Sequence, residues 1–346
     1  MKQYARMPDL PATSAASSAL PGTDTANQAP ARTGAATRTP CAPWWGPARM
    51  PFLLLTLACM AWAVACCRWL AQHGGNALHW SDAALATLGA LAAHVGTNAL
   101  NEYVDFRSGL DACTQRTPFS GGSGTLPARP RLAAVALGLG VGGLALSAAL
   151  GLYFLWHHPA SRPLLLPLGL AGLALAAAYT PWITRHPWLC LLAPGLGFGP
   201  LMTLGTAAVL LDGPGPQAIA TMAVVALLPF GLANALLLLN QYPDIEADRR
   251  VGRRTLPMVL GPSRTWPVLA LQYLLAYGAL LACVGALGLP RPALLGLLTA
   301  PLAARTVHGA MHHAHHTAAL LPTLRRNVHV CLLTLLLAAA GVAMGS

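Results

Sequence analysis

Carboxylates are scarce in this chain, and three of them fall in one short segment. Residues 240–255 read N-Q-Y-P-D-I-E-A-D-R-R-V-G-R-R-T, which spaces Asn240, Asp244 and Asp248 four residues apart. If a helix continues through Pro243, residues at this spacing share one of its faces. Carboxylate and amide oxygens are ligands that Mg²⁺ prefers, so the segment predicts a site for a divalent cation.

An earlier segment carries the same pattern. Residues 98–111 read N-A-L-N-E-Y-V-D-F-R-S-G-L-D, where Asn101 and Asp105 are four residues apart and Asp111 follows. The two segments hold six of the ten acidic residues of the chain. Each follows a long apolar run, so we interpret them as two halves of one site, built at the ends of two helices and able to hold a diphosphate through bridging metal ions.

The elements that position these residues are predicted to be membrane helices. The chain has 346 residues, of which 55% are hydrophobic and only 9% charged. Soluble domains carry about 25% charged residues, so this composition indicates a multi-pass protein of the lipid bilayer. The net charge of +11 is almost all arginine and is typical of membrane orientation signals, with no basic and aromatic pattern for nucleic acid.

Apolar runs long enough to cross a bilayer recur after residue 45. We expect residues 1–45 to form a disordered cytoplasmic tail and residues 46–346 to form an all-α transmembrane bundle. About nine membrane helices are predicted, at residues 50–70, 82–105, 131–154, 163–183, 188–211, 217–241, 266–288, 292–309 and 327–345. Arg305 interrupts the eighth, which is the weakest of these segments.

Arginines gather in the even-numbered connections between these segments. By the positive-inside rule, the N-terminus and those connections are cytoplasmic, which places both acidic segments on the cytoplasmic side. The expected location is a bacterial inner membrane, with the site facing the cytoplasm. Small residues in 137–149 predict close helix packing, and the histidines between His308 and His316 are interpreted as an interfacial loop.

Arginines beside the acidic segments are candidate ligands for phosphate oxygens, since a guanidinium presents forked donors. They are Arg116, Arg249, Arg253 and Arg254. The alternative is that acids and arginines at helix ends only form interfacial salt bridges or orientation signals. Two matched N-x-x-x-D patterns on one side of the membrane favour a binding site.

The two segments, with R-T-P-F-S-G-G-S-G at residues 116–124, resemble the aspartate-rich motifs of the UbiA superfamily of intramembrane prenyltransferases. The resemblance extends through A-Y-T at 178–180 and G-L-G-F-G-P-L-M-T-L-G-T at 195–206. It is strongest to the 1,4-dihydroxy-2-naphthoate polyprenyltransferases of menaquinone synthesis. Glu102 stands where that branch often has Asp, Arg253 stands where it has Lys, and residues 181–211 lack a carboxylate that many members carry.

The resemblance implies a bundle around a central cavity, where Mg²⁺ assists ionisation of a polyprenyl diphosphate and an aromatic acceptor takes the prenyl group. It implies metal ligation by Asn101, Asp105, Asp111, Asn240, Asp244 and Asp248. Asp105, Asp244 and Asp248 are the expected catalytic carboxylates. Three tyrosines, Tyr103, Tyr179 and Tyr242, are candidates to stabilise the allylic cation, or alternatively anchor at the membrane interface.

Other functions remain open at this point. Within the same superfamily, the acceptor is alternatively 4-hydroxybenzoate or haem. A polytopic transporter is the alternative from another class, although transporters place polar groups near the bilayer midplane rather than at helix ends. The sequence leaves donor chain length, general base and oligomeric state undetermined.

Overall fold

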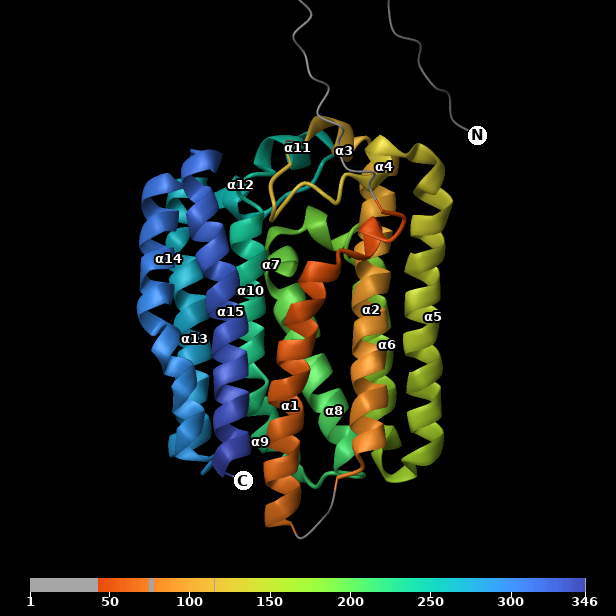
Figure 1. The fold of residues 1–346 in the computed structure, drawn as a ribbon, viewed down its shortest axis with the longest axis vertical. Helices are drawn as coiled ribbons and strands as arrows, with labels where there is room; N and C mark the ends of the chain where they lie inside the picture. The colour runs from red at the N-terminus through yellow and green to blue at the C-terminus, as the bar shows by residue number, and fades with distance from the viewer. Residues whose placement is uncertain (1–42, 75–77, 115, 346) are drawn as a thin grey trace, which may run out of the picture. The chain divides into compact units, whose positions relative to one another are not determined.

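A computed structural model describes residues 43–74, 78–114 and 116–345, and helices are the only regular elements in these ranges (Figure 1). The predicted all-α membrane bundle is confirmed. The expected N-terminal tail lies outside the described residues except for its last three positions. Residues 41–346 form a single compact unit.

The long helices run alternately up and down the bundle in chain order (Figure 1). They are α1 (Leu53–His73), α2 (Trp80–Arg107), α5 (Ala133–His157), α6 (Arg162–Ala178), α7 (Pro187–Leu196) with α8 (Met202–Leu210), α9 (Pro216–Val225) with α10 (Leu227–Asn240), α13 (Trp266–Gly285), α14 (Ala300–His313) and α15 (Thr317–Gly345).

Eight helical stretches among the described residues are long and apolar enough to cross a membrane, close to the expected nine. The expected eighth segment instead forms a 3₁₀ stretch, η8 (Arg291–Thr299), followed by α14. Arg305 and the histidines near the end of α14 make this stretch less apolar than its neighbours. It nevertheless packs along α13 and α15 as part of the bundle (Figure 1).

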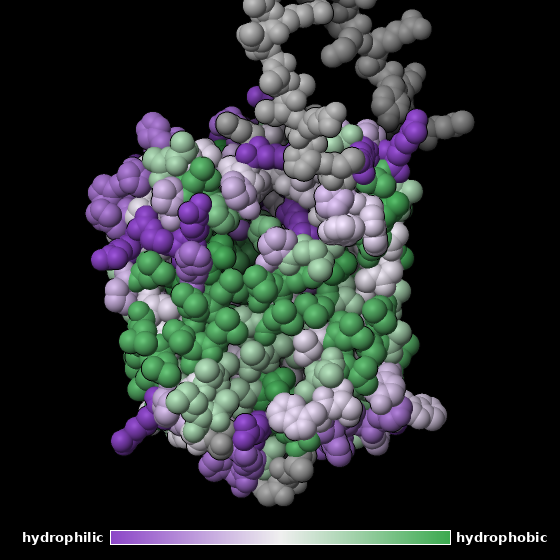
Figure 2. Space-filling model, viewed as in Figure 1, coloured by the Kyte–Doolittle hydropathy of each residue, from purple (hydrophilic) through white to green (hydrophobic). Residues whose placement is uncertain are grey.

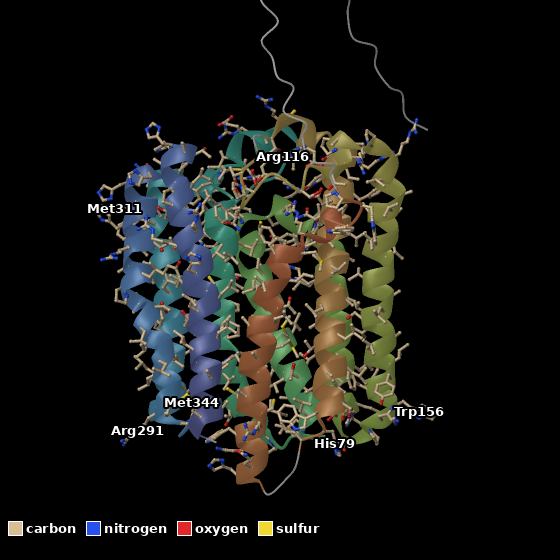
Figure 3. The ribbon with its side chains drawn as sticks, in the orientation of Figure 1. His79, Arg116, Trp156, Arg291, Met311 and Met344 are labelled. Atoms are coloured by element: carbon tan, nitrogen blue, oxygen red, sulfur yellow. The ribbon has the colours of Figure 1, made fainter. Side chains whose placement is uncertain are left out.

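Hydrophilic side chains gather at the two ends of the molecule and leave an apolar band between them (Figure 2). At one end, four short helices cap the bundle: α3 (Leu110–Cys113), α4 (Thr125–Ala128), α11 (Ile245–Arg250) and α12 (Leu256–Leu260). Arg116 lies at this end, whereas Trp156 and Arg291 lie at the other (Figure 3). The chain therefore brings both acidic segments to the same end, as expected.

Glycines let α2 and α5 approach closely, which confirms the packing expected for residues 137–149. A Cβ on Gly143 would lie 2.6 Å from the carbonyl oxygen of Ala92. On the other side of α5, a Cβ on Gly142 would meet nothing within 4 Å. In lipid, where hydrophobicity does not drive helices together, such close packing supplies much of the association energy.

The centre of the bundle is formed by α10, which packs on α7, α13 and α15. Its buried Asn234 accepts a hydrogen bond from the Gly195 amide at 2.7 Å and donates one to Gln272 at 3.1 Å. The Gly195 contact lies just before η6, a π-helical turn (Gly197–Leu201) that contains Pro200. Satisfied polar groups of this kind fix the register of helices inside a membrane.

Candidate active site

The end of α2 positions the first acidic segment. This helix runs without a break to Arg107, so Asn101 and Asp105 lie one turn apart and both line the same cavity. After the left-handed turn at Gly109 (φ 76°), α3 brings Asp111 to that cavity as well. Asn101 is held in place by Thr180, whose hydroxyl donates to its Oδ1 at 3.0 Å.

The second acidic segment departs from the expected geometry, because α10 ends at Asn240 instead of continuing through Pro243. Proline has no N–H to donate, and residues 241–244 form a tight turn before α11 begins at Ile245. At the start of α11 the Asp248 amide donates to the Asp244 carbonyl at 2.8 Å. Despite the break, Asn240, Asp244 and Asp248 line one cavity.

Arg253 joins the two acidic segments. Its Nη1 donates to Asp248 at 3.1 Å, and its Nη2 donates to Asp105, which belongs to the other segment. All three side chains are largely buried. A buried carboxylate is costly unless a partner neutralises it, so this arginine stabilises the pair of acids and fixes the spacing between α2 and α11.

Several oxygens at this site have no partner. Asp111 Oδ2, Asn240 Oδ1 and Asp244 Oδ1 are buried without a hydrogen bond, and all three residues line the cavity. Hard, oxygen-only groups of this kind fit Mg²⁺. Within the described ranges, however, no three His, Cys, Asp or Glu side chains are already grouped as a metal site, since Arg253 occupies Asp105 and Asp248.

The acidic side chains of this site that have no arginine partner have raised pKa values, because they are buried close to other carboxylates. Burial, followed by the charge of Glu102, raises the pKa of Asp111 to about 7. Burial, followed by the charge of Asp248, raises the pKa of Asp244 to about 7. Both shifts are expected where carboxylates crowd together without a cation, and a bound cation would reverse them.

The acidic residues form the polar end of a cavity of about 620 Å³. Below them its walls are apolar, with Leu144, Phe198 and Met202 among the lining residues. Along α2 the lining extends from Asp105 to Ala86, a separation of about 28 Å at the rise of an α-helix. One chamber thus offers a charged end and a long hydrocarbon-like interior.

Other predicted residues lie away from this chamber. Arg249 is exposed and pairs with Glu246 at 2.9 Å, and Arg254 and Arg116 are also exposed.

Among the three tyrosines only Tyr179 lines the cavity. Tyr103 lies two residues from both Asn101 and Asp105 and therefore on another face of α2. Tyr242 is buried in the turn after α10, outside the lining.

Sequence reasoning missed Arg49, which also lines the cavity. It sits in the left-handed region (φ 49°) between two 3₁₀ turns and donates through Nε to Glu102 at 3.1 Å. Glu102 also accepts from the Ser123 amide, which ties the glycine-rich loop to α2. Arg49 stands alone before an apolar run, so only tertiary contact reveals its place.

Together, the bundle and the chamber define an integral membrane protein whose cavity combines an acid- and arginine-lined end with an apolar interior. The UbiA prenyltransferase family model matches residues 56–320. The chain belongs to this family and is a prenyltransferase, which sets aside the transporter alternative.

A curated relative and a solved structure agree with this assignment. The chain is 31% identical to a 1,4-dihydroxy-2-naphthoate octaprenyltransferase of Mycobacterium tuberculosis over 310 residues, which cover 88% of this chain and 98% of the relative. The fold is similar to the apo structure of a UbiA homolog from Aeropyrum pernix K1, with a TM-score of 0.61 and 18% identity. That match covers 86% of this chain and 98% of the other.

Proposed function

We propose that this protein transfers a polyprenyl group from a polyprenyl diphosphate to 1,4-dihydroxy-2-naphthoate, with Mg²⁺ as cofactor and with the acidic end facing the cytoplasm. The observation that carries the proposal is the chamber itself. Its charged end suits a diphosphate, and its apolar interior suits an isoprenoid chain. The naphthoate acceptor is inferred from the relative that covers nearly the whole chain.

The unpartnered oxygens of Asp111, Asn240 and Asp244 support the magnesium assignment. With Asn101, Asp105 and Asp248 they form the proposed ligand set around the charged end. Bound Mg²⁺ would neutralise the diphosphate charge that develops as the allylic C–O bond breaks. Asp105, Asp244 and Asp248 are the proposed catalytic carboxylates.

Arginines at the charged end supply donors for diphosphate oxygens. Arg253 and Arg49 line the chamber, which supports a role for these two in contacting the diphosphate. Arg116 is exposed but close to the glycine-rich loop, since a Cβ on Gly124 would lie 2.2 Å from its Nη1. Arg249 and Arg254 border a second recess that Arg253 also lines, which suits an approach site for the anion.

The chamber wall then protects the allylic cation. Tyr179 lines the chamber together with the acidic and apolar residues, and cation–π attraction to its ring would be strengthened there by the exclusion of water. Burial raises the pKa of its hydroxyl well above the ordinary value, so the tyrosine stays neutral. Attack of the acceptor ring on the cation forms the new C–C bond to the prenyl group. The C–C bond between the ring and its carboxyl group then breaks, carbon dioxide leaves, and the electron pair of the broken bond restores the aromatic ring.

The acceptor is tested by incubating the protein in lipid vesicles with a radiolabelled polyprenyl diphosphate, Mg²⁺ and one acceptor at a time. We expect a prenylated product with 1,4-dihydroxy-2-naphthoate and release of pyrophosphate in equal amount. Prenylation of 4-hydroxybenzoate or haem in its place would refute the acceptor while retaining the reaction class. Absence of transfer to all three acceptors would contradict the proposed function.

A further inference from the structure

A basic surface remains at the edge of the bundle, far along the chain from the active-site residues. It is formed by exposed or half-exposed side chains of α14 and α15, here called the α14–α15 patch: Arg305, His308, His312, Arg325, Arg326 and His329. No residue of α13, α14 or α15 lines the active-site chamber. The patch therefore needs an explanation of its own.

Close packing brings the two halves of the patch together. A Cβ on Gly309 of α14 would lie only 2.2 Å from Thr323 Oγ1 of α15, so the helices touch at this level. Across this seam, Arg326 Nη1 donates to the carbonyl of Arg305 at 3.3 Å. Its other donors reach Thr323 Oγ1 at 3.1 Å and the carbonyl of Pro322 at 3.3 Å. The guanidinium is thus held in a fixed position by neutral oxygens alone.

No acidic side chain in the part of the chain that the structure describes pairs with the arginines of the patch. The chain contains no acidic residue after Asp248, and none of the ion pairs in the described ranges involves these arginines. The contrast with the active site is clear, because Arg49 and Arg253 there both pair with carboxylates. Arg305 and Arg326 are therefore available to an anion that comes from outside the described residues.

The surroundings indicate what kind of anion it is. The patch lies on the same end of the bundle as the active site, and hydrophilic side chains cover the upper part of α14 and α15 above an apolar surface (Figure 2). Leu333 and Leu336 of α15 are 44% and 46% exposed, and Leu298, in the η8 stretch just before α14, is 68% exposed. Leu333 and Leu336 continue the helical face of Arg326 and His329 at spacings of three and four.

We propose that the α14–α15 patch binds the headgroup of an anionic phospholipid, whose acyl chains lie along the exposed leucines below. Arg305 and Arg326 contact the phosphate, and His308 and His329 border it. Arginine forks match phosphate oxygens, and their hydrocarbon stems extend along apolar surface while the charge reaches the headgroup level. Basic clusters between membrane helices are the expected sites for such lipids.

The experiment measures lipid binding by the purified protein in detergent. Dioctanoyl phosphatidylglycerol is titrated while thermal unfolding is followed, with dioctanoyl phosphatidylcholine and glycerol 3-phosphate as parallel arms. A ligand that binds the native state stabilises it by RT ln(1 + c/Kd) at free ligand concentration c, so the unfolding midpoint rises as the ligand concentration exceeds Kd. We expect phosphatidylglycerol to raise the midpoint and the other two compounds to leave it nearly unchanged.

The deciding variant is Arg305→Gln/Arg326→Gln, and its matched control is Arg131→Gln/Arg185→Gln. Both lose two positive charges at the same end of the bundle. The patch variant should bind phosphatidylglycerol about 30-fold more weakly than the control and the wild type. Equal binding by the two variants, or equal effects of the two lipids on the wild type, would overturn the proposal, as would an equal effect of glycerol 3-phosphate.

A second measurement covers the case in which the patch variant fails to fold. Wild-type protein in vesicles is exposed to a photoactivatable phosphatidylglycerol with its reactive group at the headgroup. Mass spectrometry should find the label on peptides of α14 and α15. Label distributed evenly over all helix ends at this side of the bundle would contradict a defined site.

Discussion

Arg253 shows at the scale of single residues how two clusters far apart in sequence become one site. It bridges Asp105 and Asp248, whereas the neighbouring Arg249 pairs with Glu246 in solvent. Arg253→Gln leaves two carboxylates buried without a partner, which should destabilise the protein by about 3 kcal/mol or more. The exposed pair contributes little, so Arg249→Gln should stay within about 0.5 kcal/mol of wild type.

Chemical denaturation in detergent, with helicity as the signal, measures both changes. Activity supplies a second readout, since Arg253→Gln should also reduce transfer and Arg249→Gln should retain most of it. Equal effects of the two substitutions on stability would show that Arg253 does not hold the acidic segments together.

Tyr179 allows a separate test of the chamber wall. Removing the ring in Tyr179→Leu should lower kcat about 30-fold, because cation–π attraction at a water-excluded site is worth about 2 kcal/mol. Tyr179→Phe keeps the ring and should stay within a few-fold of wild type. Tyr103→Leu is the control, as Tyr103 does not line the chamber. A larger loss for Tyr103→Leu than for Tyr179→Leu would reverse the assignment.

The packing of α2 against α5 depends on glycines, and only on the face of α5 that contacts α2. Gly143→Ala forces a Cβ against the backbone of α2, so we expect destabilisation by about 1–3 kcal/mol through overpacking. Gly142→Ala meets open space and gains helix propensity, so it should be neutral or slightly stabilising. Thermal unfolding in one detergent compares the two, and a Gly143→Ala variant as stable as Gly142→Ala would contradict the close approach.

Helix periodicity made part of the site predictable from the sequence. Helical spacing alone predicted that Asn101 and Asp105 share a face. The apolar runs predicted that both acidic segments end helices, and the distribution of arginines predicted that these ends lie on one side. Pro243 was the exception, because its missing N–H ends α10 at Asn240, yet Asn240, Asp244 and Asp248 still line one cavity.

Contacts between distant elements could not be predicted in this way. Arg49 reaches Glu102 only because the turns before α1 lie against α2, and no local pattern encodes that approach. Likewise, spacing along the chain does not distinguish Arg253 from Arg249 or Arg254. The candidacy of Tyr103 is different, because its position two residues from Asn101 and Asp105 was a signal in the sequence that the prediction did not use.

For the molecule as a whole, metal binding should be coupled to proton release. Burial and neighbouring charge raise the pKa of Asp244 and of Asp111 to about 7, above the value of about 4 for an unfolded chain. The metal-free fold therefore retains protons that the unfolded chain has lost, so its stability falls as pH rises from about 4 to 7. Mg²⁺ binds the deprotonated forms and should offset this loss.

Because both carboxyls must be deprotonated, we expect the apparent affinity for Mg²⁺, measured from the shift in unfolding midpoint, to be about 100-fold higher at pH 8 than at pH 6. Asp244→Asn removes one of the titrating groups and should reduce that difference. Asp82, which lies at the opposite end of the bundle, supplies the control substitution Asp82→Asn. Stabilisation by Mg²⁺ that is the same at both pH values would contradict the linkage.

The central claim is that the two acidic segments act as one Mg²⁺-dependent prenyl-transfer site, and the pair Asp244 and Glu246 tests it most directly. They are two residues apart, but Asp244 lines the chamber whereas Glu246 is exposed beside Arg249.

The measurement is transfer of a polyprenyl group to 1,4-dihydroxy-2-naphthoate by wild type, Asp244→Asn and Glu246→Gln in vesicles, with Mg²⁺ or with EDTA. We predict Mg²⁺-dependent transfer by wild type and Glu246→Gln and a loss of about 100-fold or more in Asp244→Asn. Undiminished transfer by Asp244→Asn, or transfer in EDTA, would contradict the account.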